Sequence, residues 1–253
     1  MTATPNGVLP IDKPLGWTSF DVVAVARRAL GAKRVGHGGT LDPLATGVLP
    51  LLVGTATKFA DRLHTASKVY AALVEFGSET ATDDREGAVT READPPALSR
   101  EELDAALAPF RGTLAQVPPA YAAVKVDGRR AYSRARSGET MELAARAVTI
   151  ERLAIASWET PSLRLLVVCS TGTYIRSLAR DVGRAVGSAA HLGGLRRLAV
   201  GALTVDDALS VEALRGGPDA ARLREADDRI LPLAERFREA PAAELLSSWG
   251  RAT

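Results

Sequence analysis

Three observations on the sequence predict a mixed α/β domain. The chain has 253 residues, of which 46% are hydrophobic and 25% charged, so it is long enough for one full hydrophobic core and has an ordinary globular composition. Segments of alternating apolar residues, typical of strands, lie between segments of helical periodicity. The sequence contains no repeat and no low-complexity tract, so neither a solenoid nor a disordered protein is expected.

The N-terminal segment predicts a strand, a turn and a helix. Residues 7–19, GVLPIDKPLGWTS, alternate apolar residues with turn residues. The next run places Val22, Ala26 and Leu30 on one helical face. Thr18 precedes this run and Asp21 follows three positions later, as in a helix capping box. Residues 36–47 are too rich in Gly and Pro for regular structure, and VLPLLVG after them predicts a buried element under a functional loop.

The later elements follow from the same patterns. Residues 70–76 and 163–169 alternate like strands and end at turn residues. A helix is expected over 175–187, with Arg176, Arg180 and Arg184 spaced four residues apart on one face. Helices are also expected over 100–110 and 219–238.

Composition excludes several classes of protein. The longest apolar runs are far shorter than the roughly 20 residues of a membrane span, and the first residues do not resemble a secretion signal. The one cysteine, Cys169, and three scattered histidines give neither an intrachain disulfide nor a zinc motif. We therefore expect a cytoplasmic protein without a metal.

Charge is unevenly distributed, although the net charge is only +2. Residues 120–200 contain thirteen Lys and Arg against six Asp and Glu, whereas residues 78–108 contain three against nine. This distribution predicts that one region faces a polyanion and another is repelled by it.

Asp42 is the first candidate for chemistry. It lies in a loop with four glycines, and the following Pro43 favours an extended backbone at Asp42, which can direct its side chain out of the loop. The alternative is an Asp-Pro turn in which Asp42 has a structural role. A phosphate-binding loop is excluded because the chain has no matching motif and an acidic residue repels phosphate.

A basic segment over about 119–147 is the second candidate. Lys125, Arg129, Arg130 and Arg134 alternate there with aromatic residues. Basic groups bind phosphates and aromatic faces stack on exposed bases, which suits single-stranded or looped RNA. A solvated charged face is the alternative. Tyr174 and Arg176 lie at a predicted strand-to-helix junction, where Arg176 is either an active-site group or an ion-pair partner.

Taken together and in order, seven stretches resemble the TruB family, the bacterial tRNA pseudouridine-55 synthases. They are DKPLGWTS, VGHGGTLDPLATGVLP, GTATKF, SKVYAALVEFG, PPAYAAVKVDGRRAYSRAR, CSTGTYIRSLARDVG and AHLGGLRRLAVG. The resemblance implies an α+β pseudouridine-synthase fold, with a largely antiparallel mixed sheet flanked by helices. It also implies that the chain binds the T arm of tRNA as a monomer and converts uridine 55 of the T loop to pseudouridine.

The resemblance also implies a domain division. Residues 1–210 would form the catalytic domain, with the basic segment as an RNA-gripping insertion. Residues 211–253 would form a short helical extension, where many relatives begin an RNA-binding PUA domain that is expected to be incomplete here.

Site residues follow from the resemblance position by position. Asp42 takes the place of the family's essential aspartate, Tyr70 that of its active-site tyrosine, and Arg176 that of the arginine paired with the aspartate. The expected substrate-binding residues are His37, Lys58, Tyr174 and Leu195, together with Lys125, Arg129, Arg130 and Arg134 of the basic segment.

The expected reaction explains these residue types. Forming pseudouridine breaks the N1–C1′ bond, turns the uracil and rejoins it through C5, without net redox change, so no cofactor is expected. A carboxylate stabilises or traps the positive charge at C1′. Three routes at Asp42 stay open: a covalent adduct at C1′, addition to the base, and removal of a sugar proton to give a glycal. A synthase for another RNA, or a tRNA-binding folding helper, is the alternative function.

Overall fold

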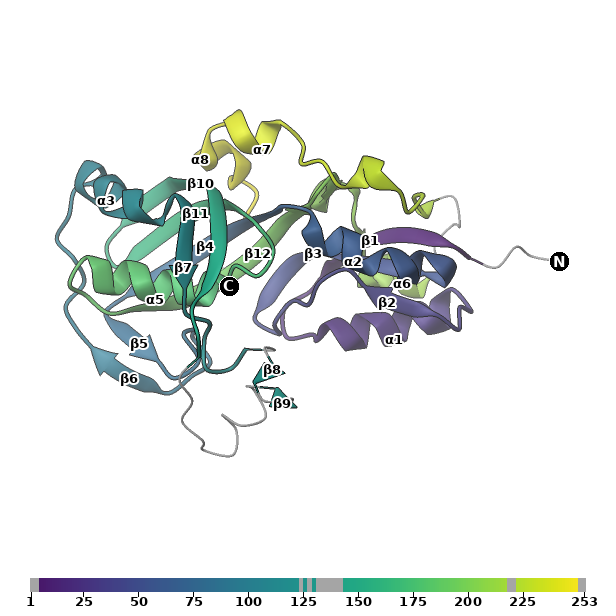
Figure 1. The fold of residues 1–253 in the computed structure, drawn as a ribbon, viewed down its shortest axis with the longest axis horizontal. Helices are drawn as coiled ribbons and strands as arrows, with labels where there is room; N and C mark the ends of the chain where they lie inside the picture. Colours follow the sequence, from purple (N-terminus) through teal and green to yellow (C-terminus); the bar gives the residue numbers. More distant parts are fainter. Residues whose placement is uncertain (1–4, 123–124, 127–128, 131–142, 218–221, 250–253) are drawn as a thin grey trace. The chain divides into compact units, whose positions relative to one another are not determined.

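The computed structural model describes residues 5–122, 125–126, 129–130, 143–217 and 222–249 (Figure 1). These residues form two compact units, and neither is continuous in sequence. The first unit contains residues 1–71 and 195–240, and the second contains residues 72–194 and 241–253. Within the described ranges, none of the helices has the length and apolar character needed to span a membrane.

The first unit is built on a sheet with strand order β14-β1-β3-β12. Strands β1 and β3 are antiparallel, with Gly7 opposite Val53, and β12 runs parallel to β3, with Leu195 opposite Ala45. Strand β2 pairs with β3 and β13 pairs with β12. The bounds of these strands are Gly7–Lys13 for β1, Val35–His37 for β2, Ala45–Val53 for β3, Ala190–Val200 for β12, Leu203–Thr204 for β13 and Leu209–Ser210 for β14.

Helices cover both faces of this sheet. Alternation along β3 directs Leu49 and Leu51 to one face, where they pack against α1 and α6. Val48 and Leu52 point to the other face and pack against α2. The helices of the unit are α1 Ser19–Ala29, η1 Gly54–Phe59, α2 Ala60–Thr65, η3 Val205–Asp207, α6 Val211–Arg215, η5 Asp228–Ile230 and α7 Arg236–Glu239.

The second unit has the strand order β12-β4-β11-β10-β7, with a separate pair β5-β6. Its neighbours β11 and β10, and β10 and β7, are antiparallel. Strands β4 and β12 contribute residues to both units. The bounds are β4 Lys68–Phe76, β5 Ser78–Thr80, β6 Val89–Glu92, β7 Gly112–Gln116, β10 Arg146–Glu159, β11 Ser162–Cys169, α3 Arg100–Leu107, η2 Ala108–Phe110, α5 Ile175–Ala185 and α8 Ala242–Leu245.

Most predicted elements are confirmed. Thr18 caps α1, and its side chain and that of Asp21 exchange the two hydrogen bonds of a capping box. The strands predicted over 70–76 and 163–169 are β4 and β11, and the helices predicted over 100–110 and 175–187 are α3 with η2, and α5. The irregular loop predicted over 36–47 is shorter than expected, because β2 ends at His37 and β3 begins at Ala45.

The helix predicted over 219–238 is wrong. The elements that the structure describes in this range include η5 and α7, which are short and separated by irregular residues, so there is no continuous helix over the described part. Pro232 lies between them and has no N–H for a helical hydrogen bond. Asp227 accepts from the Arg229 N–H at 2.9 Å and so starts a new short turn. The domain boundary at residue 210 stays a prediction.

Candidate active site

Asp42 lies in a loop of the first unit whose backbone is fixed on both sides. The buried hydroxyl of Ser19, at the start of α1, accepts from the Leu41 N–H at 2.9 Å and donates to the Leu41 carbonyl at 3.2 Å. After Asp42, the Pro43 carbonyl accepts from the Gly16 N–H at 2.9 Å. Asp42 itself accepts from the Ala45 N–H at 3.0 Å through its carbonyl. These bonds leave the half-buried Asp42 side chain on a rigid support.

Two buried cations also donate to this loop. Lys13 donates its ammonium to the Trp17 carbonyl at 2.6 Å and to the Pro43 carbonyl at 3.5 Å. Arg197 donates to the carbonyls of Gly39 at 3.0 Å and Thr40 at 3.4 Å. Lys13 and Arg197 are fully or almost fully buried, so both act inside the fold and not at its surface.

Tyr70 and Leu195 belong to the same neighbourhood. Both side chains pack, half-buried, against the core cluster that contains Leu41 and Ala45, the residues on either side of the Asp42 turn. Leu195 also pairs with Ala45 across β12 and β3. Tyr70 and Leu195 therefore pack against the residues that support the Asp42 loop.

His37 is the last residue of β2 and is half-buried. Burial lowers its pKa below the usual 6.5, and the positive charge of Arg197 lowers it further, so both effects favour the neutral ring. Within the described ranges its Nδ1 atom is buried without a hydrogen-bond partner. Lys58 lies on η1 with an exposed side chain.

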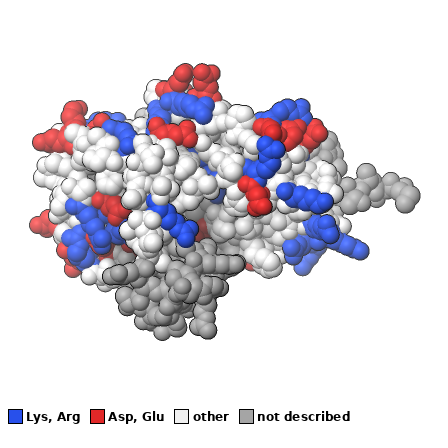
Figure 2. All heavy atoms as spheres, viewed as in Figure 1, with Lys and Arg blue, Asp and Glu red and all other residues white. Residues whose placement is uncertain are grey.

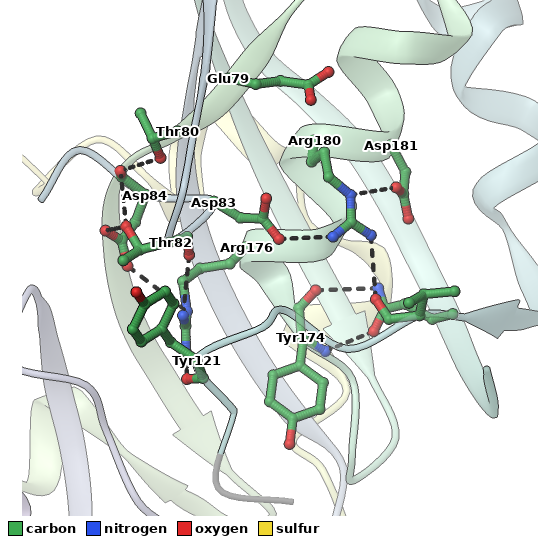
Figure 3. A network of polar contacts seen from close by, with 12 residues as sticks. Glu79, Thr80, Thr82, Asp83, Asp84, Tyr121, Tyr174, Arg176, Arg180 and Asp181 are labelled. Atoms are coloured by element: carbon green, nitrogen blue, oxygen red, sulfur yellow. Dashed lines mark hydrogen bonds and ion pairs between the residues drawn. The ribbon is translucent and has the colours of Figure 1, made fainter. Parts of the chain in front are cut away.

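Tyr174 and Arg176 lie at the start of α5 in the second unit. Gln116 of β7 fixes the backbone of Tyr174, because its side chain accepts from the Tyr174 N–H at 2.8 Å and donates to the Tyr174 carbonyl at 3.1 Å. The Tyr174 ring points away from the neighbouring ion pairs (Figure 3). The predicted junction between strand and helix is confirmed, since β11 ends at Cys169 and Tyr174 caps α5.

Arg176 is a buried residue with a side chain only 8% exposed. Its guanidinium donates to the carbonyls of Thr82 at 3.1 Å and Tyr121 at 3.2 Å, and lies 3.8 Å from the Asp84 carboxylate (Figure 3). Burial rules out the simple surface ion pair that the sequence left open. The pairing of Arg176 with Asp42 stays a prediction, because the two residues belong to different units.

The acidic stretch that follows β4 pairs with the arginines of α5. Arg180 lies 2.7 Å from Asp83, and Arg184 lies 2.6 Å from Glu79. Together with Arg176 beside Asp84, three arginines spaced four residues apart on α5 each lie next to an acidic residue. Hydrogen bonds from Arg184, and then from Arg91, lower the pKa of Glu79 to about 2. Part of the acidic stretch is thus neutralised within its own unit, and the repelling surface predicted from its composition stays a prediction.

The basic segment is described only in part. Lys125 and Arg129 belong to the short strands β8 Lys125–Val126 and β9 Arg129–Arg130, which pair as a two-stranded sheet. The structure describes the backbone there. Arg134 lies outside the described residues. The phosphate-binding role of these four residues therefore stays a prediction.

Sequence reasoning missed the residues that hold the site in place. Ser19, Lys13 and Arg197 support the Asp42 loop, and Gln116 supports Tyr174. All four lie in or beside matched stretches, but their roles depend on burial and on partners far away in sequence. Of these four residues, only Ser19 stands in a sequence pattern that suggests a structural role, because it lies at a predicted helix start.

A family model described as "TruB family pseudouridylate synthase (N terminal domain)" matches residues 27–175, more than half of the chain. The chain belongs to the TruB family. The resemblance predicted from the sequence motifs is confirmed, and with it an enzyme of the isomerase class, because pseudouridylate synthases rearrange a nucleotide without adding or removing atoms.

Curated TruB relatives match most of the chain. The tRNA pseudouridine synthase B of Ralstonia nicotianae is 48% identical over 221 residues, which cover 86% of this chain and 70% of that protein. The protein of the same name from Cupriavidus pinatubonensis is 50% identical over 220 residues, which again cover 86% of this chain and 70% of that protein.

Solved structures support the fold. A chain in the crystal structure of a Cbf5-Nop10-Gar1 complex superimposes with a TM-score of 0.67 at 26% identity, covering 88% of this chain and 61% of that chain. The mixed, largely antiparallel sheet with flanking helices is the predicted pseudouridine-synthase fold, so the α+β prediction is confirmed.

Proposed function

We propose that this TruB chain converts uridine 55 in the T loop of tRNA to pseudouridine, with Asp42 as its essential carboxylate. The names of the relatives support tRNA as the substrate. The observation that carries the proposal is the fixed loop around Asp42, in which Leu41 and Pro43 are both held by hydrogen bonds from other elements.

The proposed role of Asp42 is to act at C1′ of the target nucleotide. Cleavage of the N1–C1′ bond develops positive charge on the sugar, which an ionised carboxylate at a fixed position stabilises or traps. The uracil, which leaves with the electron pair of the N1–C1′ bond, then turns while still bound. C5 attacks C1′, the C5 proton is lost and N1 takes up a proton. Atoms and electrons balance without an added reagent, since one glycosidic bond replaces another.

Tyr70, Arg176 and His37 receive supporting roles in this proposal. The Tyr70 ring offers an aromatic face to the flipped uracil, and its hydroxyl a group for proton transfer. Arg176 supplies a guanidinium suited to a bidentate pair with Asp42. The neutral His37, with its buried and unpartnered Nδ1, is suited to accept or donate a hydrogen bond to the nucleotide.

The surface of the first unit fits a nucleic acid. The exposed face of α1 carries Phe20, 66% exposed, at its first turn, and Arg28 two turns later. Lys33 and Arg34 are exposed just beyond the helix. In Figure 2, Lys and Arg side chains gather over the part of this unit that holds α1 and α2. An exposed aromatic at one end of a helix and several exposed cations at the other suit stacked bases and phosphates.

Single-turnover tritium release from tRNA containing 5-tritiated uridine tests the proposal. We expect Asp42→Asn to lower the rate by about a thousandfold or more while the Kd for tRNA changes little, because the variant keeps the size of the side chain and removes its charge. Asp61→Asn is the matched control, since Asp61 is an exposed carboxylate on α2, and it should retain the wild-type rate.

Mapping the product separates the alternatives. Pseudouridine at position 55 of the wild-type product supports the proposal. Pseudouridine only at other positions, or only in another RNA, would favour a synthase of different specificity. Tight tRNA binding by the wild type without tritium release would favour the folding helper. A substantial rate for Asp42→Asn would refute the assignment of Asp42.

A further inference from the structure

Arg197 is a buried charge whose role the reaction above does not use. Its side chain lies inside the first unit and is 1% exposed. It donates from Nε to the Val48 carbonyl at 2.7 Å, and from its two terminal nitrogens to the carbonyls of Gly39 at 3.0 Å and Thr40 at 3.4 Å. One guanidinium therefore connects both ends of the segment that contains Asp42.

The charge of Arg197 has unusual partners. Buried arginines are normally paired with a carboxylate, because an isolated buried charge is costly. Among the described residues no carboxylate lies within ion-pair distance of Arg197, and its hydrogen bonds all go to backbone carbonyls. A cation retained in this environment stabilises the particular conformation that directs those carbonyls toward it.

The neighbouring Arg196 shows what an ordinary arginine of the same strand does. Its two terminal nitrogens form a bidentate pair with Asp12, at 3.0 and 2.7 Å. Its side chain is 23% exposed. Because alternate residues of a strand point to opposite faces, β12 directs Arg196 to Asp12 and Arg197 beneath the Asp42 loop.

Two glycines shape the backbone of the loop next to Arg197. Gly39 has a positive φ of 127°, a backbone conformation that favours glycine, and it lies next to the Arg197 guanidinium, since a Cβ there would be in ordinary contact with Nη1 at 3.6 Å. Gly47, at the start of β3, approaches the backbone of Arg197 so closely that any Cβ would overlap its carbonyl oxygen. The two glycines therefore allow the left-handed backbone next to the Arg197 guanidinium and the close approach of β3 to the backbone of β12.

We propose that Arg197 is a positioning residue, which holds the backbone of residues 39–48 in the conformation that presents Asp42 to the nucleotide. The inference rests on the proposed role of Asp42. Arg197 does not touch the substrate in this proposal. It acts by keeping the loop pre-organised, so its loss slows the chemical step and leaves tRNA binding nearly unchanged.

Two conservative variants test the proposal. Arg197→Lys keeps the charge but has one nitrogen in place of the three that span the loop, and Arg197→Gln keeps a donor without the charge. We expect both to bind tRNA with a Kd within about threefold of wild type, and to lose about a hundredfold in single-turnover rate, the size of effect that a misplacement of about 1 Å produces. Arg196→Gln is the matched control, and should stay within about threefold in both measurements.

Hydrogen exchange supplies a readout that does not depend on activity. In Arg197→Lys the Leu41 amide should exchange at least about tenfold faster than in wild type, while amides of α5 in the second unit keep their rates. The titration of His37 by NMR separates charge from shape, because the charge of Arg197 lowers the pKa of His37. That pKa should rise in Arg197→Gln and stay near its wild-type value in Arg197→Lys.

Each outcome decides the inference. Unchanged turnover together with unchanged Leu41 exchange would overturn it, and so would a loss confined to tRNA affinity. If neither Arg197 variant folds, Arg197 supports the whole unit and not the loop, and the proposal is wrong. If wild-type protein does not act on tRNA, the proposed function fails, while the exchange and titration results still test the positioning role.

Discussion

At the residue scale, Tyr70 separates two proposed tasks within one side chain. The ring packs half-buried against the cluster under the Asp42 loop, so it is held at a fixed orientation. Tyr70→Phe keeps this packing and the stacking face but removes the hydroxyl. We expect the Kd for tRNA to stay within about threefold and the single-turnover rate to fall by about a hundredfold or more, the usual size of a general acid–base contribution.

The control for this variant is Tyr70→Leu, which removes the ring as well and should weaken binding in addition to slowing turnover. Filter binding and tritium release on the same tRNA give both quantities. Normal turnover by Tyr70→Phe would show that the hydroxyl has no part in proton transfer, and would leave Tyr70 as a stacking group only.

Single residues also show where sequence reasoning stops. Asp42, Tyr70 and Arg176 were identified because they stand in long motifs that resemble a family. Arg196 and Arg197 stand side by side in one of these motifs, yet one pairs with Asp12 and the other is buried under a loop about 150 positions earlier. Only the pairing of β12 with β3 decides this, and the sequence does not specify which strands pair.

At the scale of elements, helix α5 is held by carboxylates from the segment that follows β4. The most strongly bound of these is Glu79, which accepts hydrogen bonds from Arg184 and Arg91 and has a side chain only 6% exposed. These bonds hold its pKa near 2, below the ordinary 4.5. Folding therefore favours the ionised form of Glu79.

We expect Glu79→Gln to lower the free energy of unfolding by about 1–2 kcal/mol at pH 7, a figure reduced for the solvent exposure of Arg184. The stabilisation by Glu79 is complete above pH 4.5 and disappears as the pH falls toward 2, because the unfolded chain then binds the proton first. Urea unfolding at pH 7 and pH 3 should show the difference between variant and wild type shrinking at the lower pH.

Glu92→Gln serves as the control, since Glu92 is an exposed residue of β6, and it should change the free energy by less than about 0.5 kcal/mol at either pH. A difference for Glu79→Gln that is equal at both pH values would mean that its effect comes from packing and not from the ion pairs.

Features encoded by residues close together in the sequence could be predicted, whereas features that depend on distant residues could not. The capping box of α1 is encoded within four residues, so it could be predicted from Thr18 and Asp21 alone. Helical periodicity over 219–238 was misleading, because Pro232 and the cap at Asp227 divide that range into short turns. The arginines of α5 and the acidic residues near Asp83 both stand out in the sequence. About 100 residues separate them, however, so their pairing is a property of the fold.

At the scale of the whole molecule, charge distribution matters more than the net charge of +2. Each unit combines distant parts of the chain, which is why the sequence order alone did not predict these units. In the second unit, acidic residues neutralise several arginines. In the first unit, Arg28, Lys33 and Arg34 are exposed at the end of α1 and beyond it, and Phe20 is exposed in the first turn of the same helix.

This difference predicts how tRNA affinity depends on salt. Each phosphate neutralised by a basic side chain releases counterions, so the logarithm of the affinity falls with the logarithm of the salt concentration. Replacing Arg28, Lys33 and Arg34 by Ala should weaken binding and flatten this slope by roughly one unit per lost contact. The matched control replaces Arg229 and Arg236, which pair with Asp227 and Asp206 on the chain itself and should leave the slope unchanged. Filter binding of tRNA at several salt concentrations measures both slopes. An equal flattening in the two variants would mean that phosphate contacts are spread over the surface and that α1 is not a preferred face, since arginines already paired with carboxylates would then contribute as much as Arg28, Lys33 and Arg34.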